Sequence, residues 1–306
     1  MEKAKERKKK VRESNHHFRS QGIKLSKGEK VLEIIILLIV LFTCLLLLYP
    51  FLYMIAVSFS AYDQVVNVWL WPVGFNFDAY IAIFQMKSIW LGFLNSIVYT
   101  LVGLIISMVL SVLCAYPLSK KWLPGKKIIT VFVLITMYFG GGLIPCYLVA
   151  TQILHLKNTI WAIVLPGALN TYFMILIRTY FANIPSEIEE AARIDGANEL
   201  QILLRIYLPL SKPILATISL YYIVISWNGW FSASIYLDNE AMYPLQLLLR
   251  NALATGNIWI GGNGSDVNYQ SMNYALTMVV VLPMIILFPF CQKYFVKGAL
   301  VGSLKE

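Results

Sequence analysis

The sequence predicts an all-α, polytopic membrane protein with six transmembrane helices. Hydrophobic residues make up 58% of the 306 residues and charged residues only 13%, and the mean hydropathy is +0.68. Soluble globular domains carry about 25% charged residues, so this composition excludes that class. Six stretches without a charged side chain are long enough to cross a bilayer, which takes about 20 residues as a helix.

The charge-free stretches set the order of the predicted spans. Each stretch is bounded by charged residues, and a helix of about 1.5 Å rise per residue fits inside or slightly beyond it. The stretches are 34–62, 88–119, 128–156, 158–177, 213–237 and 267–292, and the spans expected from them are 32–57, 93–119, 128–152, 159–181, 211–235 and 271–295. An even number of spans places both termini on one side of the membrane.

Basic residues predict which side that is. Residues 1–30 form a basic tail with 11 Lys+Arg against 4 Glu, and residues 31–306 form the membrane domain. With the tail, 22 of the 25 basic residues fall on one side of six spans, and only Lys87, Lys157 and Arg250 fall on the other. Because cytoplasmic loops carry the excess of Lys and Arg, both termini are expected in the cytoplasm. A basic tail directly before a span determines topology, so no nucleic-acid binding is predicted.

The central segment, residues 184–213, is the most charged part of the chain after the tail, and it predicts two short cytoplasmic helices. Ser186 and Glu189 fit a capping box, so the first helix is expected to begin there. Gly196 is expected to end it, because glycine enters the left-handed turn without a steric penalty. The second helix would run from Asn198 towards Ile206.

The first of these helices is expected to have two different sides. Ile188, Ala191 and Ala192 form a small side suited to close packing, and the opposite side is charged. Glu190 is expected to face outward, where its carboxylate can meet a basic group or backbone donors of another protein. This pattern indicates a helix held by a second subunit.

The outer segment 236–270 is long for a connection between spans. Leu245–Leu253 predicts a short interfacial helix, and the part that follows is typical of a projecting flexible loop. The residues that give it this character are Gly256, Gly261, Gly262, Asn263 and Gly264. The length favours a contact outside the membrane, and a passive connection is the alternative.

The chain lacks the sequence motifs of an ATPase or a hydrolase. No phosphate-binding loop of the form G-x-x-x-x-G-K-[ST] occurs, and neither H-E-x-x-H nor G-x-S-x-G is present. The His and Cys residues show no metal-ligand spacing, so no metal or cofactor is expected on this chain. No acidic or basic residue lies in the middle of a predicted span, which argues against ion-coupled transport. A transport role for this chain would therefore need energy from another subunit.

Polar and aromatic residues gather in the fourth and fifth predicted spans. They are Asn170, Tyr172, Tyr221, Tyr222, Trp227 and Asn228. Flat aromatic faces beside amide and hydroxyl groups suit a polyhydroxylated ligand, which offers C–H faces and many hydrogen-bonding groups. These residues are candidates for a substrate pathway. The alternative is that they pack helices together or form an interfacial belt.

Seven residues of the central segment stand at the spacing of a known signature. The signature reads EAA, three residues, G, nine residues, I, one residue and LP. Its specified positions are here Glu190, Ala191, Ala192, Gly196, Ile206, Leu208 and Pro209. This resembles, without a gap, the cytoplasmic loop signature of permeases of binding-protein-dependent ABC importers. The resemblance implies a coupling helix that sits in a groove of an ATPase subunit, and the coupling residues would be Glu189, Glu190, Ala191, Ala192, Asp195 and Gly196. A chance amphipathic helix–turn–helix is the alternative.

Four further stretches look like the sugar-importer branch of these permeases. They are GGLIPCYL at 141–148, LLRIYLPLSKPILATI at 203–218, WNGWFSASIYL at 227–237 and YPLQLLLRNAL at 243–253. Within that branch the chain is most similar to the second of the two maltose-type permeases and to polysaccharide or oligogalacturonide permeases of Gram-positive bacteria. The resemblance covers roughly residues 30–306 and leaves out the basic tail.

The resemblance implies a set of partners in a bacterial cell membrane. They are a second, homologous permease, two copies of an ATPase that uses ATP and Mg, an extracellular solute-binding protein, and an oligosaccharide substrate. In maltose-type relatives the third outer loop enters the sugar cleft of the binding protein, which Gly256–Asp266 matches by position. The C-terminal tail of such relatives reaches between the ATPase subunits, and 292–306 is similar.

The function expected from these observations is sugar uptake by alternating access, energised by the separate ATPase. Two other classes stay open. An amino-acid or peptide ABC importer would share the central segment, although it should lack the WN and YPLQ stretches. A permease-like sensor or scaffold would have no ATPase partner.

Overall fold

The computed structural model describes residues 27–61, 65, 67–255 and 269–303, and within these residues the chain forms helices and connections without a strand. This confirms the helical class predicted from the composition. The chain divides into two compact units, Met1–Tyr53 and Met54–Glu306.

Helix α2 (Lys27–Ser58) makes up the described part of unit 1 and ends in unit 2. Its portion Lys30–Ser58 has 29 residues and is apolar enough to cross a membrane. The first predicted span, 32–57, lies inside it. Pro50 stands within the helix, where its missing N–H removes one helical hydrogen bond.

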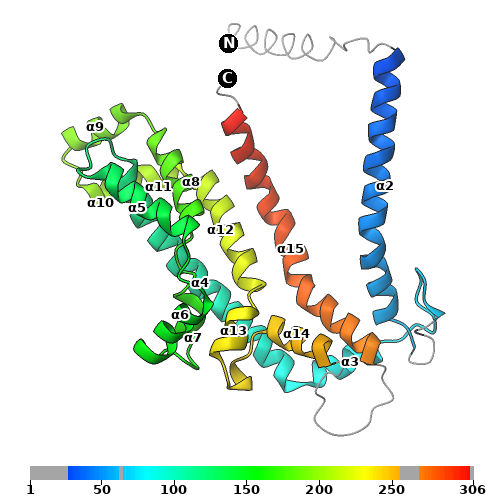
Figure 1. Cartoon of the computed structure of the whole chain (residues 1–306). Coiled ribbons are helices and arrows are strands. Elements are labelled where there is room, and N and C mark those ends of the chain that lie inside the picture. Colours follow the sequence, from blue (N-terminus) through cyan, green and yellow to red (C-terminus); the bar gives the residue numbers. More distant parts are fainter. Residues whose placement is uncertain (1–26, 62–64, 66, 256–268, 304–306) are drawn as a thin grey trace, which may run out of the picture. The chain divides into compact units, whose positions relative to one another are not determined.

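Unit 2 contains the remaining helices (Figure 1). In chain order they are α3 (Asp78–Gln85), α4 (Lys87–Ser119), α5 (Lys126–Tyr138), α6 (Leu143–Leu148), η2 (Val149–Ile153), α7 (Ile160–Val164), α8 (Thr171–Ala182), α9 (Ser186–Ile194), α10 (Glu199–Ile202), η3 (Leu203–Tyr207), α11 (Leu208–Leu210), α12 (Lys212–Trp227), α13 (Phe231–Tyr236), η4 (Glu240–Met242), α14 (Leu245–Thr255) and α15 (Tyr269–Ser303).

Among the described residues, three helices are long and apolar enough to cross a membrane by themselves. They are Lys30–Ser58, Lys87–Ser119 and Gln270–Pro289. These segments contain all or most of the first, second and sixth predicted spans, which shows that a continuous charge-free stretch was a sufficient signal for those three.

The other predicted spans are interrupted. α5 and the helix Leu143–Ile153 meet at an angle of 106°, and Glu199–Leu210 meets α12 at 82°. The first bend lies at Gly140–Gly142, where the chain has the least backbone restriction. Pro166 and Gly167 separate α7 from α8 inside the fourth predicted span. If each bent pair crosses as one span, the described residues hold up to five spans, so the count of six remains a prediction.

Helix α4 is the element against which α8 and α12 pack. Every fourth residue along one of its faces is small and buried, in the order Gly103, Ser107, Ser111, Ala115 and Ser119. Such a face lets neighbouring helices approach closely in a bilayer. A Cβ atom added at Gly103 would lie 3.3 Å from Ser226 Oγ of α12, so the approach is close there.

Two apolar clusters hold unit 2 together. One lies among α4, α8, α10, η3 and α12 and includes Tyr116, Phe181, Ile202 and Ile218. The other joins α3, α4, α14 and α15 through Ile83, Ile89, Leu245 and Met272. Figure 1 shows α9 and α10 at one end of unit 2, and α3, α13 and α14 at the opposite end. The two ends are therefore anchored by separate clusters along the same helix, α4.

Candidate functional site

The candidate site is the junction between the end of α4 and the α9–α10 pair. α9 begins at Ser186 with Pro185 as its N-cap, and no side chain caps it. The capping box expected from Ser186 and Glu189 is therefore wrong. The reason is that Pro185, which has no polar side chain, occupies the N-cap position, and the Glu189 carboxylate binds Lys120 and Tyr207 instead.

A capping box does form at the start of α10. Asn198 Oδ1 accepts a hydrogen bond from the Gln201 backbone N–H at 2.9 Å, and the Asn198 backbone N–H donates to Gln201 Oε1 at 2.9 Å. Each side chain satisfies a backbone N–H that the helix itself leaves free. This fixes the start of the second helix at the predicted residue.

Gly196 ends α9 as predicted. Its φ is +80°, in the left-handed region that glycine enters without a Cβ clash. The Ala197 N–H donates to the Ala192 carbonyl at 2.9 Å and the Gly196 N–H to the Arg193 carbonyl at 3.0 Å. These bonds satisfy carbonyls at the end of α9 and turn the chain into α10 within four residues.

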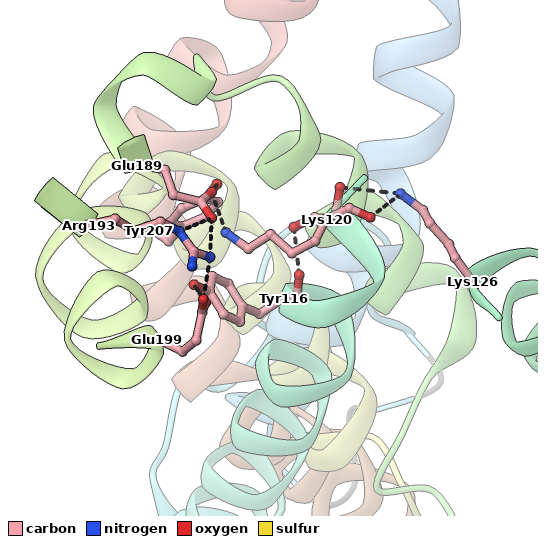
Figure 2. Close-up of polar contacts among 8 residues, drawn as sticks. Tyr116, Lys120, Lys126, Glu189, Arg193, Glu199 and Tyr207 are labelled. Atoms are coloured by element: carbon pink, nitrogen blue, oxygen red, sulfur yellow. Dashed lines mark hydrogen bonds and ion pairs between the residues drawn. The ribbon is translucent and has the colours of Figure 1, made fainter. Parts of the chain in front are cut away.

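Glu189 is the centre of a buried ionic cluster (Figure 2). Its Oε2 accepts hydrogen bonds from Lys120 Nζ at 2.6 Å and from Tyr207 OH at 2.7 Å. Its Oε1 accepts from Arg193, 2.9 Å from Nη2 and 3.3 Å from Nε. Only 11% of the Glu189 side chain and 4% of the Lys120 side chain are exposed. A buried carboxylate is tolerated when its oxygens are bonded in this way.

The cluster extends to α10 through Arg193. Its Nη2 also forms an ion pair with Glu199 Oε1, and Glu199 Oε2 accepts a hydrogen bond from Tyr116 OH at 2.7 Å. Lys120 Nζ lies 4.1 Å from the centroid of the Tyr116 ring and 3.9 Å from that of Tyr207, within the range of a cation–π contact. One connected set of charges and rings thus joins α4, α9, α10 and η3.

Cations also gather at the C-terminal end of α4. Lys126 Nζ donates to the carbonyls of Ser119 at 3.3 Å and Lys120 at 2.9 Å, and Arg178 Nε donates to the Leu118 carbonyl at 3.1 Å. The last carbonyls of a helix have no partner inside it and carry partial negative charge. These side chains therefore fix the end of α4 on which Lys120 stands.

The cluster shifts the titration of Glu189. Burial raises the pKa of its carboxyl, but the hydrogen bonds from Lys120, Tyr207 and Arg193 outweigh burial and hold the pKa below its usual range. Burial lowers the pKa of Lys120, and the bond to Glu189 opposes that shift. The carboxylate is consequently charged at neutral pH and stays bound to α4.

The outward side of α9 carries both apolar and charged residues. Ile188 is 40% exposed and Ile194 86% exposed, and Ala191 and Glu190 are also exposed. The sequence predicted a small side formed by Ile188, Ala191 and Ala192 and an outward Glu190, and Glu190 is exposed as predicted. The inward position is taken by Glu189, because Lys120 and Tyr207 offer it bonds that an apolar residue could not use.

The predicted coupling residues thus separate into two groups. Glu189 and half-buried Ala192 face the chain, whereas Glu190, Ala191 and Asp195 are exposed beside the turn at Gly196. Sequence analysis missed the residues that bind Glu189, which are Lys120, Arg193 and Tyr207, and also Tyr116, which binds Glu199. Lys120 and Arg193 entered it only as basic residues that set the topology.

Two of the candidate pathway residues are packed inside unit 2. Tyr222 is 3% exposed, and its OH contacts Ser111 Oγ at 2.8 Å and accepts from the Asn170 backbone N–H at 3.2 Å. Trp227 is 4% exposed, and its Nε1 donates to the Val280 carbonyl at 3.2 Å. Their polar atoms are thus bonded within the protein.

The other candidate pathway residues are more accessible. Asn170 is half-buried and caps α8 by accepting from the Phe173 N–H at 3.2 Å. Tyr172 is 52% exposed, and Tyr221 is 39% exposed and stacks on Phe173 with ring centroids 5.4 Å apart. Asn228 is exposed at the end of α12. A pathway role for any of the six stays a prediction.

The expected binding-protein loop, with Gly256, Gly261, Gly262, Asn263 and Gly264, lies outside the described residues. The helix predicted at Leu245–Leu253 lies within α14. Across the described ranges no group of three or more His, Cys, Asp or Glu side chains is placed to hold a metal ion.

The long apolar helices indicate the class of integral membrane proteins. The chain belongs to the family described as "Binding-protein-dependent transport system inner membrane component", which matches residues 23–300. The resemblance found in the central segment is confirmed, and this family is a transport permease component and not an ATPase.

Curated relatives agree with this placement. The chain is 40% identical over 283 residues to the polygalacturonan/rhamnogalacturonan transport system permease protein YtcP of Bacillus subtilis (strain 168). That alignment covers 90% of this chain and 99% of the relative. It is 37% identical over 262 residues to the protein LplC of the same organism, covering 84% of this chain and 88% of the relative.

A solved structure supports the fold. A chain in the crystal structure of a bacterial ABC transporter involved in the import of the acidic polysaccharide alginate superimposes with a TM-score of 0.83 at 33% identity, and the match covers 89% of this chain and 99% of that one. A second alginate transporter chain, in complex with a pentasaccharide-bound periplasmic protein, has a TM-score of 0.56 at 14% identity, covering 87% and 95%. The fold is therefore that of an ABC importer permease.

Proposed function

We propose that this chain is the permease subunit of an ATP-driven importer of oligosaccharides, and that α9 is the coupling helix that docks on a separate ATPase. The observation that carries the proposal is the orientation of α9. Glu189 holds it from inside, while Ile188, Ala191 and Ile194 are exposed at a charged end of unit 2. Exposed apolar side chains interspersed with charges indicate a contact with a protein partner.

The substrate class is proposed from the relatives. Their names refer to polygalacturonan and rhamnogalacturonan, to arabinooligosaccharides and to alginate. All of these are carbohydrates, which favours an oligosaccharide over an amino acid or a peptide. We place the accessible pathway residues, Tyr172, Tyr221 and Asn228, at the sugar, with Tyr222 and Trp227 holding the helices behind them.

The complex would contain further subunits. A second, homologous permease completes the pathway, two ATPase copies bind the ATP and Mg, and an extracellular binding protein delivers the sugar. The solved alginate transporter with its sugar-bound periplasmic protein supports the last of these. Six spans with both termini in the cytoplasm place the α9 end inside the cell and the α13–α14 end outside.

The mechanism follows from the attachment of α9. When ATP closes the ATPase dimer, α9 moves with the surface on which it docks. The Lys120–Glu189 pair transfers that movement to α4, against which α8 and α12 pack. The spans then open outward to accept the sugar. Such coupling requires contacts that differ between the two states.

The test is a variant that changes the exposed face of α9 and nothing behind it. Ile194→Asp should insert in the membrane at the wild-type level but retain much less ATPase on purification, because a charge replaces an apolar contact. Ile194→Leu is the matched control and should keep the ATPase. A full complement of ATPase on Ile194→Asp, with normal sugar-stimulated hydrolysis, would contradict the docking role. If the wild-type chain purifies with no ATPase, the sensor or scaffold alternative holds.

Orientation is tested separately by single cysteines. One at Asn198 should react only with membrane-permeant reagents, and one at Asn239, at the opposite end of unit 2, should react with impermeant reagents in whole cells. Labelling of position 198 from outside would reverse the proposed topology.

A further inference from the structure

An arginine lies over a tryptophan at the end of unit 2 opposite α9. Trp230 is the N-cap of α13, and Arg250 stands in α14. The guanidinium carbon of Arg250 is 5.1 Å from the centroid of the Trp230 ring, within the range of a cation–π contact. Figure 1 shows α13 and α14 together at this end.

The aromatic side of this pair is open. Trp230 is 37% exposed and the neighbouring Phe231 is 47% exposed. The two rings are 5.7 Å apart and nearly perpendicular, at 88°. The faces of the two rings therefore point in different directions beside the guanidinium of Arg250. An exposed ring next to an exposed cation is a surface that a ligand can use.

The charge of Arg250 is also available. Lys157, another cation of this end, is bound to Asp238 at 2.7 Å, whereas Arg250 forms no ion pair with a carboxylate of the described residues. Its helix is fixed, because Leu245 and Leu247 of α14 are buried. A guanidinium held over a ring keeps its N–H donors at its edge, where a planar carboxylate can bind two of them.

We propose that Trp230 and Arg250 form an outer subsite for a sugar residue that carries a carboxylate, a uronate. This inference rests on the proposed function and narrows its substrate to acidic oligosaccharides. The ring packs against the C–H face of the sugar and the guanidinium binds its carboxylate. A neutral sugar would use the ring alone. The named substrates of two relatives, polygalacturonan and the acidic polysaccharide alginate, agree with this chemistry.

The experiment compares one sugar in two charge states. The complete complex, with its binding protein, is reconstituted in proteoliposomes, and the initial uptake of a trigalacturonide is measured as the free acid and as the methyl ester. Arg250→Gln should lower uptake of the acid about three- to fivefold, the upper part of the range of an exposed charged contact, and leave the ester within about twofold of wild type. Lys157→Gln is the matched control and should not separate the two sugars.

Each variant is compared with wild type on the same sugar, so the preference of the binding protein cancels. Trp230→Ala should lower both uptakes, and Trp230→Phe should restore them. An equal loss of acid and ester in Arg250→Gln would overturn the subsite and indicate that Arg250 meets a carboxylate of a partner protein or supports the fold. Unchanged uptake of the acid would overturn it as well. If the wild-type complex carries neither sugar but hydrolyses ATP with another solute, the proposed substrate class itself is wrong.

Discussion

Removing the Lys120 charge should release α9 from α4. In Lys120→Met the apolar stem is kept, but Glu189 loses the nearest of its donors, at 2.6 Å. A hydrogen bond to a charged group contributes about 1.5–3 kcal/mol, and the two ring contacts of Lys120 add about 0.5–1 kcal/mol each. Arg193 and Tyr207 still bind the carboxylate, so the loss of stabilisation stays below the sum of these contributions.

We expect Lys120→Met to lower the free energy of detaching α9 from α4 by about 2–4 kcal/mol, which raises the equilibrium constant for detachment roughly 30- to 1,000-fold. Amide hydrogen exchange of peptides covering 186–202 measures this equilibrium directly, because exchange in native protein reports local opening. Lys121→Met is the matched control, since Lys121 is the exposed neighbour of Lys120. Wild-type protection in Lys120→Met would refute the assignment of the pair as the attachment of α9.

Three further outcomes follow from the same geometry. Gly196→Val should lower the free energy of unfolding by about 1 kcal/mol or more through backbone strain, because φ is +80°. A Cβ there meets no atom within 4 Å, so the strain acts without a steric clash. Sugar-stimulated ATPase activity should fall in Gly196→Val, whereas Gly196→Asn, which tolerates this φ, should keep most of that activity. The pKa of folded Glu189 lies below its ordinary value of 4.5, so the stabilisation by its carboxylate is full above that value and is lost as the pH falls through the folded pKa. The difference in melting temperature between wild type and Glu189→Gln should therefore stay constant from neutral pH down to 4.5 and shrink as the pH falls further. A difference that does not shrink at lower pH would contradict the depressed pKa. Tyr222→Phe should lower the melting temperature by removing a bond worth about 1–3 kcal/mol from the Asn170 N–H, and an unchanged melting temperature would leave the ligand role as the better account of that hydroxyl.

The features predicted correctly from sequence depend on local chemistry. Gly196 was identifiable because a left-handed residue at the end of a helix favours glycine whatever surrounds it. Likewise, α4 and α15 were identifiable because a long charge-free stretch in a membrane protein has few alternatives to a helix. In both cases the deciding interactions lie within a few residues of the feature.

The inward side of α9 could not be predicted in the same way. The deciding partner, Lys120, is 69 residues away from Glu189 in the chain. The sequence pattern identified Ile188, Ala191 and Ala192 as a side suited to close packing, as in an amphipathic helix, but it did not identify the residue that faces the chain. That residue is a carboxylate because a buried cation binds it.

The interrupted spans show a similar limit. Pro166 and Gly167 are residues that interrupt helices, but whether a proline kinks a helix or ends it depends on what satisfies the freed backbone groups. Here Asn170 restarts the helix by capping α8, and Tyr222 of α12 binds the Asn170 N–H. The break is thus stabilised by a side chain from another helix, which a pattern along one segment does not contain.

A buried ion pair at the α4–α9 junction calls for an explanation, because well-packed apolar residues of similar volume are often equally or more stabilising. An apolar contact, however, leaves the rotation of a short helix loosely defined, whereas the bonds from Glu189 to Lys120 and Tyr207, which lie on two other elements, restrict its orientation. If orientation is what the pair provides, Lys120→Met combined with Glu189→Met should recover the exchange protection of 186–202 and still fail to restore sugar-stimulated ATPase activity. Recovery of both would show that attachment alone is sufficient, and that the ionic cluster has no separate role in orienting the exposed side of α9.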